Sequence, residues 1–139
     1  MFEGPIEDRL GIREFYGAYS DASMRQDRNL YLSLWSDDAT RTTDDGQLKG
    51  KPAIAEHWDG IWSILRKIGF FIEIGNIQVS GEIAASRVYC REIFTLQTGE
   101  VMKVVGRYDD ILEKVDGRWL FKQRKYQLVL DERATPNTP

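Results

Sequence analysis

The chain has 139 residues, of which 42% are hydrophobic and 29% are charged, and its formal net charge is −3. These values are typical of one globular domain that is large enough to bury a core. Both signs of charge are interspersed and no stretch approaches the roughly 18 apolar residues of a membrane span, so we expect neither a nucleic acid nor a membrane as a partner.

The first part of the chain predicts two helices. Residues 6 to about 25 place apolar or aromatic side chains on one face, at Ile12, Phe15, Tyr16, Tyr19 and Ala22. Asp27 is a candidate N-cap for a shorter helix, which carries the stripe Leu30, Tyr31, Leu34 and Trp35. Ser36-Asp37-Asp38 is expected to end that helix.

A small hairpin and a third helix are predicted next. Residues 39–43 and 47–49 are expected to pair around Asp44-Asp45-Gly46. Gly50-Lys51-Pro52 opens the third helix, because proline is tolerated in the first helical turn. Its stripe is Ile54, His57, Trp58, Ile61, Leu65 and Ile68, and Gly69 is expected to end it.

The second half, from about 70 to 130, predicts four long strands in an antiparallel meander. Three short turns join them, at Ser80-Gly81, Thr98-Gly99 and Asp116-Gly117. Glycine there supplies the positive φ that tight hairpins require. Residues 131–139 form a polar tail that we expect to be frayed. Helices followed by strands favour a single α+β domain, with its core at about 6–130 and helices packed on one face of the sheet.

Strand alternation predicts which side chains face those helices. On the second long strand the more apolar face carries Ala84, Ser86, Val88, Cys90, Phe94 and Leu96, and on the third it carries Met102, Val104, Gly106, Tyr108 and Leu112. The same alternation places two carboxylates, Glu92 and Asp110, on this inner face. A β-bulge would reverse the assignment beyond it.

Four motifs carry a resemblance to a known family. They are Tyr-Ser-Asp-Ala-Ser-Met-Arg-Gln-Asp at 19–27, Leu-Trp-Ser-Asp-Asp-Ala at 34–39, Gly-Arg-Tyr-Asp-Asp at 106–110 and Asp-Gly-Arg-Trp-Leu-Phe at 116–121. Together they resemble the SnoaL-like branch of the nuclear transport factor 2-like superfamily, relatives of polyketide cyclases, scytalone dehydratase and ketosteroid isomerase. The resemblance implies a cone, in which a curved, mostly antiparallel sheet wraps three helices around a deep apolar pocket. It also implies a homodimer through the outer sheet face, a small-molecule ligand and no cofactor.

The family's catalytic residues carry over only in part. The dehydratases have an Asp three positions before Asp27, where this chain has Met24, and a His near the start of the first long strand, where it has Phe70 and Phe71. The oxyanion-hole Tyr of ketosteroid isomerase corresponds to Tyr19. Its protonated Asp falls at or beside Asp109 and Asp110, and its base falls near Thr43 and Asp44, one residue out of register.

The predicted catalytic residues are therefore Tyr19, Glu92, Asp110 and His57. A buried phenol can donate to a substrate oxygen, and a carboxyl in an apolar pocket acquires the raised pKa that acid–base catalysis needs. His57 is the only imidazole of the chain. The alternatives are a core role for Tyr19 and His57, or arginine or lysine partners for the two carboxylates, from Arg91, Arg107, Arg124 and Lys125.

The remaining candidates are predicted walls of the pocket. They are Trp35, Trp58, Trp62, Phe71, Glu73, Tyr108 and Tyr126, with Phe70 as a further aromatic and Glu73 facing inward only if the first long strand is bulged. No metal site is expected, because Asp37-Asp38 and Asp44-Asp45 belong to a helix end and a turn. The single cysteine, Cys90, is expected to be buried; one cysteine excludes an internal disulfide and fits a reducing cytoplasm. Residues 1–5 are unlike a signal peptide.

Two functions follow from these residues. The first is a cofactor-independent lyase, isomerase or cyclase that acts on an apolar or polycyclic oxygenated substrate. The second is a non-catalytic binding protein or accessory subunit that uses the same pocket. Met24 and the two phenylalanines favour the second, and the inner-face carboxylates favour the first.

Overall fold

The computed structural model describes residues 1–132. The elements in order are β1 (Phe2–Glu3), α1 (Ile6–Arg25), α2 (Arg28–Ser33), β2 (Trp35–Thr43), β3 (Gly46–Lys49), α3 (Lys51–Ile64), β4 (Leu65–Ser80), β5 (Ile83–Leu96), β6 (Val101–Val115) and β7 (Arg118–Asp131). The expected tail at 131–139 lies outside the described residues from 133 onward, and Asp131 itself belongs to β7.

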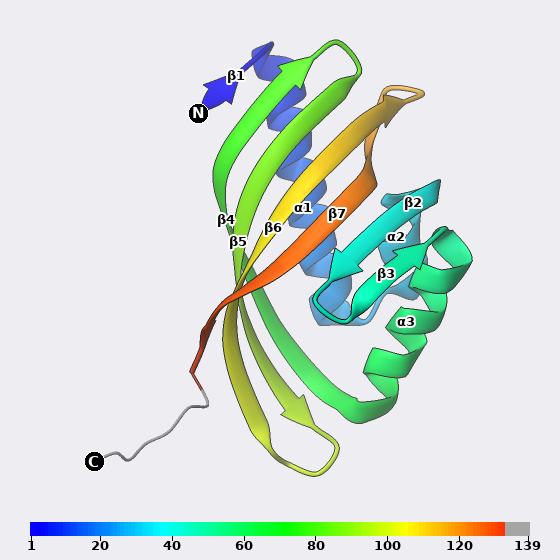
Figure 1. Cartoon of the computed structure of the whole chain (residues 1–139), viewed down its shortest axis with the longest axis vertical. Helices are drawn as coiled ribbons and strands as arrows, with labels where there is room; N and C mark the ends of the chain where they lie inside the picture. Colours follow the sequence, from blue (N-terminus) through cyan, green and yellow to red (C-terminus); the bar gives the residue numbers. More distant parts are fainter. Residues whose placement is uncertain (133–139) are drawn as a thin grey trace.

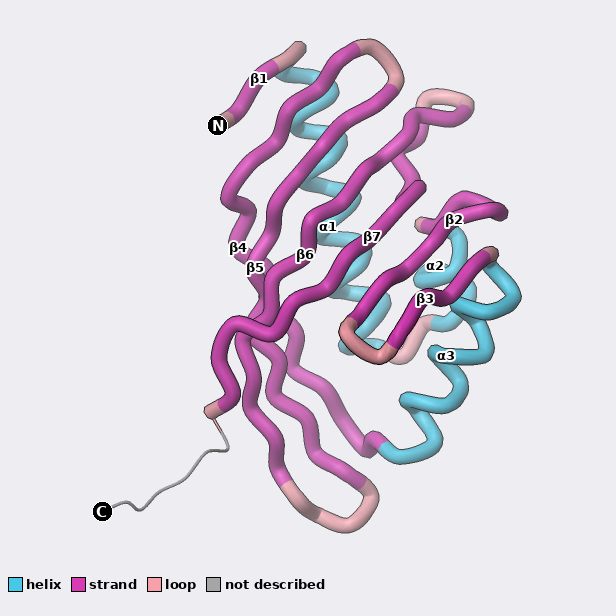
Figure 2. The backbone as a smooth tube through the Cα atoms, in the orientation of Figure 1, coloured by secondary structure: helices cyan, strands magenta, loops and turns pink. Residues whose placement is uncertain are grey.

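One seven-stranded sheet organises the molecule, in the order β1-β4-β5-β6-β7-β2-β3. The sheet curves along its four long strands, and α1 lies behind them (Figure 1). The strands from β4 to β7 pair antiparallel, whereas β1 joins β4 and β2 joins β7 in parallel. The backbone tube in Figure 2 shows α3 facing the half of β4, β5 and β6 that α1 leaves uncovered. The predicted α+β cone with its C-terminal meander is confirmed.

The helices form where the sequence places their signals. The Asp27 side chain accepts a hydrogen bond of 3.0 Å from the Leu30 amide, which caps α2 as predicted. Pro52 lies in the first turn of α3. The predicted apolar stripe of α1 is buried at Ile12, Phe15, Tyr16, Tyr19 and Ala22.

Two predicted helix ends are wrong. Helix α2 stops at Ser33, and Trp35 through Asp38 already belong to β2, whose pairing begins at Trp35 and Phe121. Helix α3 stops at Ile64 rather than at Gly69, because Leu65 adopts extended backbone and pairs with Leu96. Both segments become strands through partners far away in the sequence.

Candidate functional site

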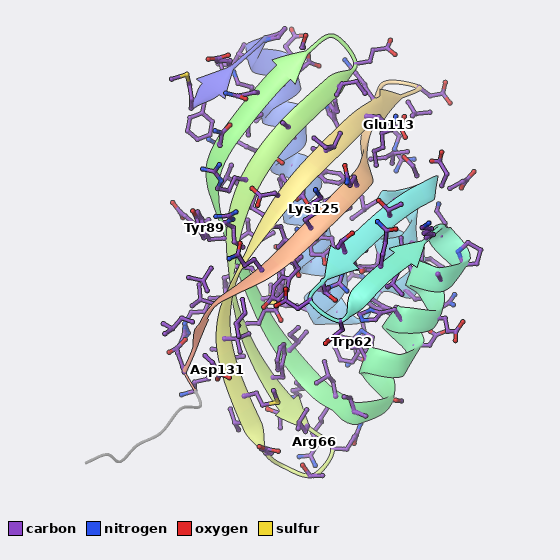
Figure 3. All side chains as sticks on the ribbon, in the orientation of Figure 1. Trp62, Arg66, Tyr89, Glu113, Lys125 and Asp131 are labelled. Carbon is purple, nitrogen blue, oxygen red and sulfur yellow. The ribbon has the colours of Figure 1, made fainter. Side chains whose placement is uncertain are left out.

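A cavity of about 280 Å³ lies between α3 and the inner face of the sheet. Its lining is mainly apolar, with Trp58, Ile61, Trp62 and Ile64 from α3, Leu65, Ile68 and Phe70 from β4, Phe94 and Leu96 from β5, and Met102 from β6. Ile61 and Ile64 are also exposed to solvent, so the cavity opens beside the C-terminal half of α3. Trp62, labelled in Figure 3, lies in that half of the helix.

Polar side chains from six different elements enter this apolar surround. They are Tyr19 from α1, Tyr31 from α2, Arg41 from β2, His57 from α3, Glu92 from β5 and Tyr108 from β6, with Ser23 beside Tyr19 on α1. A few convergent polar groups in an otherwise apolar concavity are typical of small-molecule sites. Tyr19, Glu92 and His57, predicted separately from the sequence, thus share one cavity.

Glu92 is the only carboxylate among the residues that line the cavity in the described part of the chain. Strand alternation turns it inward, and it pairs with Phe70 on β4 and with Val104 on β6. The thiol of Cys90, on the same face, donates to Oε1 of Glu92 at 3.4 Å. Burial raises the pKa of Glu92, against the opposing effects of the Cys90 contact, of Arg41 and of Arg124. A carboxyl with a raised pKa in a cavity is a candidate for proton transfer.

Two phenols that line the cavity with this carboxyl, Tyr19 and Tyr108, are held protonated. Burial is the largest cause that raises the pKa of Tyr19, and burial likewise raises the pKa of Tyr108. Each hydroxyl therefore remains a hydrogen-bond donor at neutral pH. Phenols in this state can donate to an oxygen on which negative charge develops.

Arg41 on β2 and His57 on α3 form a second polar pair in the lining of the cavity. Nη1 of Arg41 lies 3.5 Å from Nε2 of His57. Because a guanidinium can only donate, Nε2 is the acceptor and the imidazole proton resides on Nδ1. Burial lowers the pKa of His57, and the charge of Arg41 lowers it further, so the imidazole is neutral at neutral pH.

Asp110 faces inward as predicted, but it lies beneath the cavity and is absent from its lining. Nε of Arg124 donates to Oδ1 of Asp110 at 3.0 Å, and Tyr16 donates to Oδ2 at 2.6 Å. Ser86 hydrogen bonds to the same Tyr16 hydroxyl at 2.5 Å. Burial raises the pKa of Asp110, while Arg124 and Tyr16 oppose that rise. The arginine partner considered for this carboxylate in the sequence is therefore present, and it is Arg124.

Arg124 in turn supports the aromatic floor of the cavity. Its guanidinium carbon lies 3.4 Å from the ring centroid of Tyr108, 4.5 Å from that of Tyr19 and 4.4 Å from that of Phe121. Such stacking is favourable in a desolvated setting. The Asp110–Arg124 pair therefore fixes the two donor phenols from behind.

The structure corrects three of the predicted pocket walls. Phe71 is 58% exposed and lies on the outer face, because the neighbouring Phe70 is the one that turns inward. Glu73 is also exposed on that outer face, because the register shifts of β4 fall at Leu65/Lys67 and at Ile74/Asn76 and the alternation from Phe70 to Glu73 is uninterrupted. Its cross-strand partner Tyr89, labelled in Figure 3, projects from the side of the sheet away from α1.

Trp35 is the third correction, and Tyr126 is a partial one. Trp35 is fully buried in the core against Phe121, at a centroid distance of 4.7 Å, and does not line the cavity. Tyr126 lies on the inner face, 5.0 Å from Tyr108 between ring centroids, but is outside the lining. Trp58, Trp62 and Tyr108 line the cavity as predicted.

Two arginines of the site were missed as ligands or supports of the cavity. Arg41 shares its strand parity with the buried Ala39, which was a usable signal once β2 was accepted as a strand. Arg124 has the parity of Phe121 only if the β6–β7 bulge between Ile111 and Leu112 is known.

Within residues 1–132, no group of three or more His, Cys, Asp or Glu side chains is arranged to hold a metal ion, and no helix is long and apolar enough to cross a membrane.

Residues 5–125 match the family of SnoaL-like domains. The chain belongs to this family. Its sheet, helices and inward-facing cavity are those of the nuclear transport factor 2-like fold that the motifs predicted. No curated protein matches the sequence.

Solved structures share the fold of this SnoaL-like protein at low identity. A protein of Novosphingobium aromaticivorans provisionally named a scytalone dehydratase has a TM-score of 0.86 and 20% identity, with 95% of this chain and 91% of that chain covered. Another from the same organism, provisionally named an aromatic ring hydroxylase, has a TM-score of 0.85 and 20% identity, with 92% and 93% covered. A type 3 hexachlorocyclohexane dehydrochlorinase of Novosphingobium barchaimii has a TM-score of 0.80 and 17% identity, with 91% and 89% covered. These likenesses establish the fold.

Proposed function

We propose that this SnoaL-like protein catalyses cofactor-independent proton transfer at carbon, as a lyase or isomerase, on a small oxygenated apolar molecule held in the cavity. Glu92 takes and returns the proton. Tyr19 and Tyr108 donate hydrogen bonds to the substrate oxygen. One observation carries the proposal: a single carboxyl with a raised pKa shares an apolar cavity with two protonated phenols.

For a β-hydroxy ketone, the steps balance without a cofactor. The Glu92 carboxylate removes the proton from the carbon between the carbonyl and the hydroxyl-bearing carbon. The electron pair moves toward the carbonyl oxygen, where the two phenols stabilise the developing charge. The pair then forms the new carbon–carbon double bond as the carbon–oxygen bond breaks. Protonated Glu92 returns its proton to the leaving oxygen, and the products are an enone and water.

The location of Glu92 supports this role. The resemblance places the dehydratase histidine at Phe70 or Phe71, and Phe70 is the one that lines the cavity. Glu92 is the cross-strand partner of Phe70. An ionisable group thus remains at this part of the cavity, supplied by the adjacent strand. Two structural neighbours are named a dehydratase and a dehydrochlorinase, and both names describe elimination reactions. They support the proposal only by analogy, because those proteins share the fold at low identity.

A direct test uses 3-hydroxy-1-tetralone, a bicyclic β-hydroxy ketone. Loss of water and tautomerisation yield 1-naphthol, whose fluorescence reports the rate. We expect Glu92→Gln to lower the rate about 10²- to 10⁴-fold, as is usual for a general base. Tyr19→Phe should lower it about 10²- to 10³-fold, as for loss of one oxyanion donor.

Glu73→Gln is the matched control, because it removes a carboxylate from the outer face of the neighbouring strand. Equal rates for the wild type, Glu92→Gln and Tyr19→Phe would rule out this mechanism. The second candidate, a binding protein without chemistry, would then be favoured. Its structural support is Met24, which is 40% exposed on α1 and cannot transfer a proton.

We also propose the homodimer that the resemblance implies. Exposed apolar side chains support it on the outer sheet face and along the end of β7, at Phe71, Leu128, Val129 and Leu130. Sedimentation equilibrium should give twice the mass of 16.1 kDa, and Phe71→Lys should shift the protein toward monomer. A concentration-independent monomer would contradict the proposal.

A further inference from the structure

Arg41 carries a positive charge into the cavity without forming an ion pair within residues 1–132. Its side chain lines the cavity, and its Nε is buried without a hydrogen-bond partner among residues 1–132. No ion pair among these described residues includes it. A buried cation without a partner is costly, and proteins ordinarily compensate for such charges.

The other arginine of this region shows what compensation looks like. Arg124 is fully buried and pairs with Asp110 at 3.0 Å. Tyr19, Tyr31 and Tyr108 instead act on the pKa of Arg41, and these are phenols rather than carboxylates. Its one hydrogen-bond contact, to Nε2 of His57, uses a neutral imidazole as acceptor. No described residue therefore forms an ion pair with Arg41, and Glu92 acts on its charge only without such a contact.

Glu92 does not fill that role. Both side chains line the cavity, yet they form no ion pair, and the Glu92 oxygen Oε1 accepts from Cys90 instead. Nη1 of Arg41 contacts His57 and Nε is buried, whereas Nη2 makes no hydrogen bond to a described residue and is not among the buried unpaired atoms, so Nη2 is the donor left open. A guanidinium with free donors is suited to a planar carboxylate, because it can form two parallel hydrogen bonds to it.

We propose that the cavity binds a small carboxylic acid with an apolar body of one or two rings, whose carboxylate pairs with Arg41 beside His57. The ring system would lie against the apolar wall formed by Trp58, Trp62, Phe94, Leu96 and Met102. The volume of about 280 Å³ is near the lower end of ligand pockets, which suits a compact acid. This inference rests on the proposed function only in taking the same cavity as the substrate site.

The test compares three probes of one shape and different charge by isothermal titration calorimetry: 2-naphthoate, 2-naphthamide and 2-naphthylmethylammonium. We expect the wild type to bind the naphthoate about tenfold or more tightly than the amide, the gain typical of one charge-assisted contact. Arg41→Gln should abolish this preference. Arg41→Lys should retain part of it, because the charge remains and the planar fork is lost.

Arg66→Gln is the matched control. Arg66 is exposed and adjoins Leu65, which lines the cavity, so its removal changes the net charge equally without touching the proposed contact. Its preference for the naphthoate should equal that of the wild type. Equal binding of acid and amide, tighter binding of the ammonium, an Arg41→Gln protein that keeps the preference, or absence of naphthoate binding would each overturn the proposal.

His57 provides a second readout that a merely structural arginine would not change. It is the only histidine, so its imidazole resonances can be followed by NMR without assignment. The groups that face it across the cavity are Arg41, Glu92, Tyr19, Tyr31 and Tyr108. A carboxylate bound to Arg41 offsets the charge that lowers the pKa of His57, so naphthoate should raise that pKa and the amide should not.

Failure of this inference and failure of the proposed reaction are distinguishable. Glu92→Gln should lose turnover of the tetralone but should bind naphthoate as well as the wild type or better, because it removes a carboxylate from the cavity. Turnover without an acid preference would overturn the anion site alone. An acid preference without any effect of Glu92→Gln on turnover would overturn the reaction alone.

Discussion

Glu92 on β5 lies directly opposite Phe70 on β4, and both side chains line the same cavity. The family's dehydratases carry a histidine at the start of that first long strand, which in this chain is phenylalanine. An inward phenylalanine belongs to the apolar surround of this carboxyl, and burial raises the pKa of Glu92.

Glu92→Gln should alter the pH dependence of stability. Burial raises the pKa of Glu92 in the folded state, so the folded protein holds this proton more tightly than the unfolded chain does. The stability linked to that proton is complete below the ordinary glutamate pKa of about 4.3 and is lost as pH rises through the raised pKa. Glutamine does not titrate, so the variant should gain free energy of unfolding relative to the wild type as pH rises from about 4 to about 8.

Urea unfolding at several pH values measures this difference. Glu73→Gln serves as the control for loss of one carboxylate from an exposed site on the adjacent strand. A difference between Glu92→Gln and the wild type that shrinks toward high pH would contradict a buried carboxyl with a raised pKa.

The single histidine should report the charge of Arg41 directly. Burial lowers the pKa of His57, and Arg41 lowers it further. The folded state therefore binds this proton less readily than the unfolded chain, and the associated stability is present above the ordinary histidine pKa of about 6.5 and is lost as pH falls below it. In Arg41→Gln, an NMR titration of His57 should give a pKa that is higher than in the wild type but still below the ordinary value.

An unchanged His57 pKa in Arg41→Gln would place the guanidinium too far away to act on the imidazole. Arg66→Gln, which changes the net charge equally at an exposed position, should leave the titration as it is in the wild type.

Asp110 and Asp109 are adjacent in the sequence, but loss of the charge should cost much more stability at Asp110 than at Asp109. Asp110→Asn removes the charge that compensates Arg124, and both of those side chains are 0% exposed. We expect a loss of about 3–5 kcal/mol in the free energy of unfolding. Asp109 pairs with Arg87 and Arg107 and is 40% exposed, so Asp109→Asn should cost about 1 kcal/mol or less.

Chemical denaturation of both variants decides the point. The double variant Asp110→Leu/Arg124→Met should be more stable than Asp110→Asn, because it leaves no uncompensated buried charge. Similar losses for Asp109→Asn and Asp110→Asn would mean that the buried pair contributes no more than a surface pair.

Local signals predicted most of the fold, and long-range pairing explains what they missed. The meander was predictable because glycines stand at its turns and the strands alternate, as Gly81, Gly99 and Gly117 show with their positive φ. The start of β4 was not predictable, because Leu65 and Ile68 have helical spacing and share the inner face only through the register shift between Leu65 and Lys67. Their conformation is decided by pairing with β5, where Leu65 meets Leu96 and Ile68 meets Phe94.

Site residues were predictable where the pattern of a single helix or strand places them, and not where the pairing of two strands does. Tyr19 and Glu92 follow from the stripe of a helix and the alternation of a strand. Arg41 and Arg124 depend on the parallel pairing of β2 with β7, in which Arg41 is the partner of Arg124. Arg41 shares the parity of Ala39, but only the pairing of β2 with β7 places it beside Arg124, and no local pattern indicates a pairing between strands so far apart in the sequence.

Replacing Gly106 by alanine should lower the stability of the protein only when Tyr126 is present. A Cβ at Gly106 would overlap Cε1 of Tyr126 and would lie 2.7 Å from its Oη and 2.8 Å from its Cζ, so the ring must move. Gly106→Ala should therefore cost about 1–3 kcal/mol in the free energy of unfolding. In the Tyr126→Ala background the same change should be neutral or stabilise by about 0.5–1 kcal/mol, because alanine is preferred over glycine within a strand. A double-mutant cycle by urea unfolding measures the coupling, and equal effects of Gly106→Ala in both backgrounds would show that Tyr126 does not pack over this glycine.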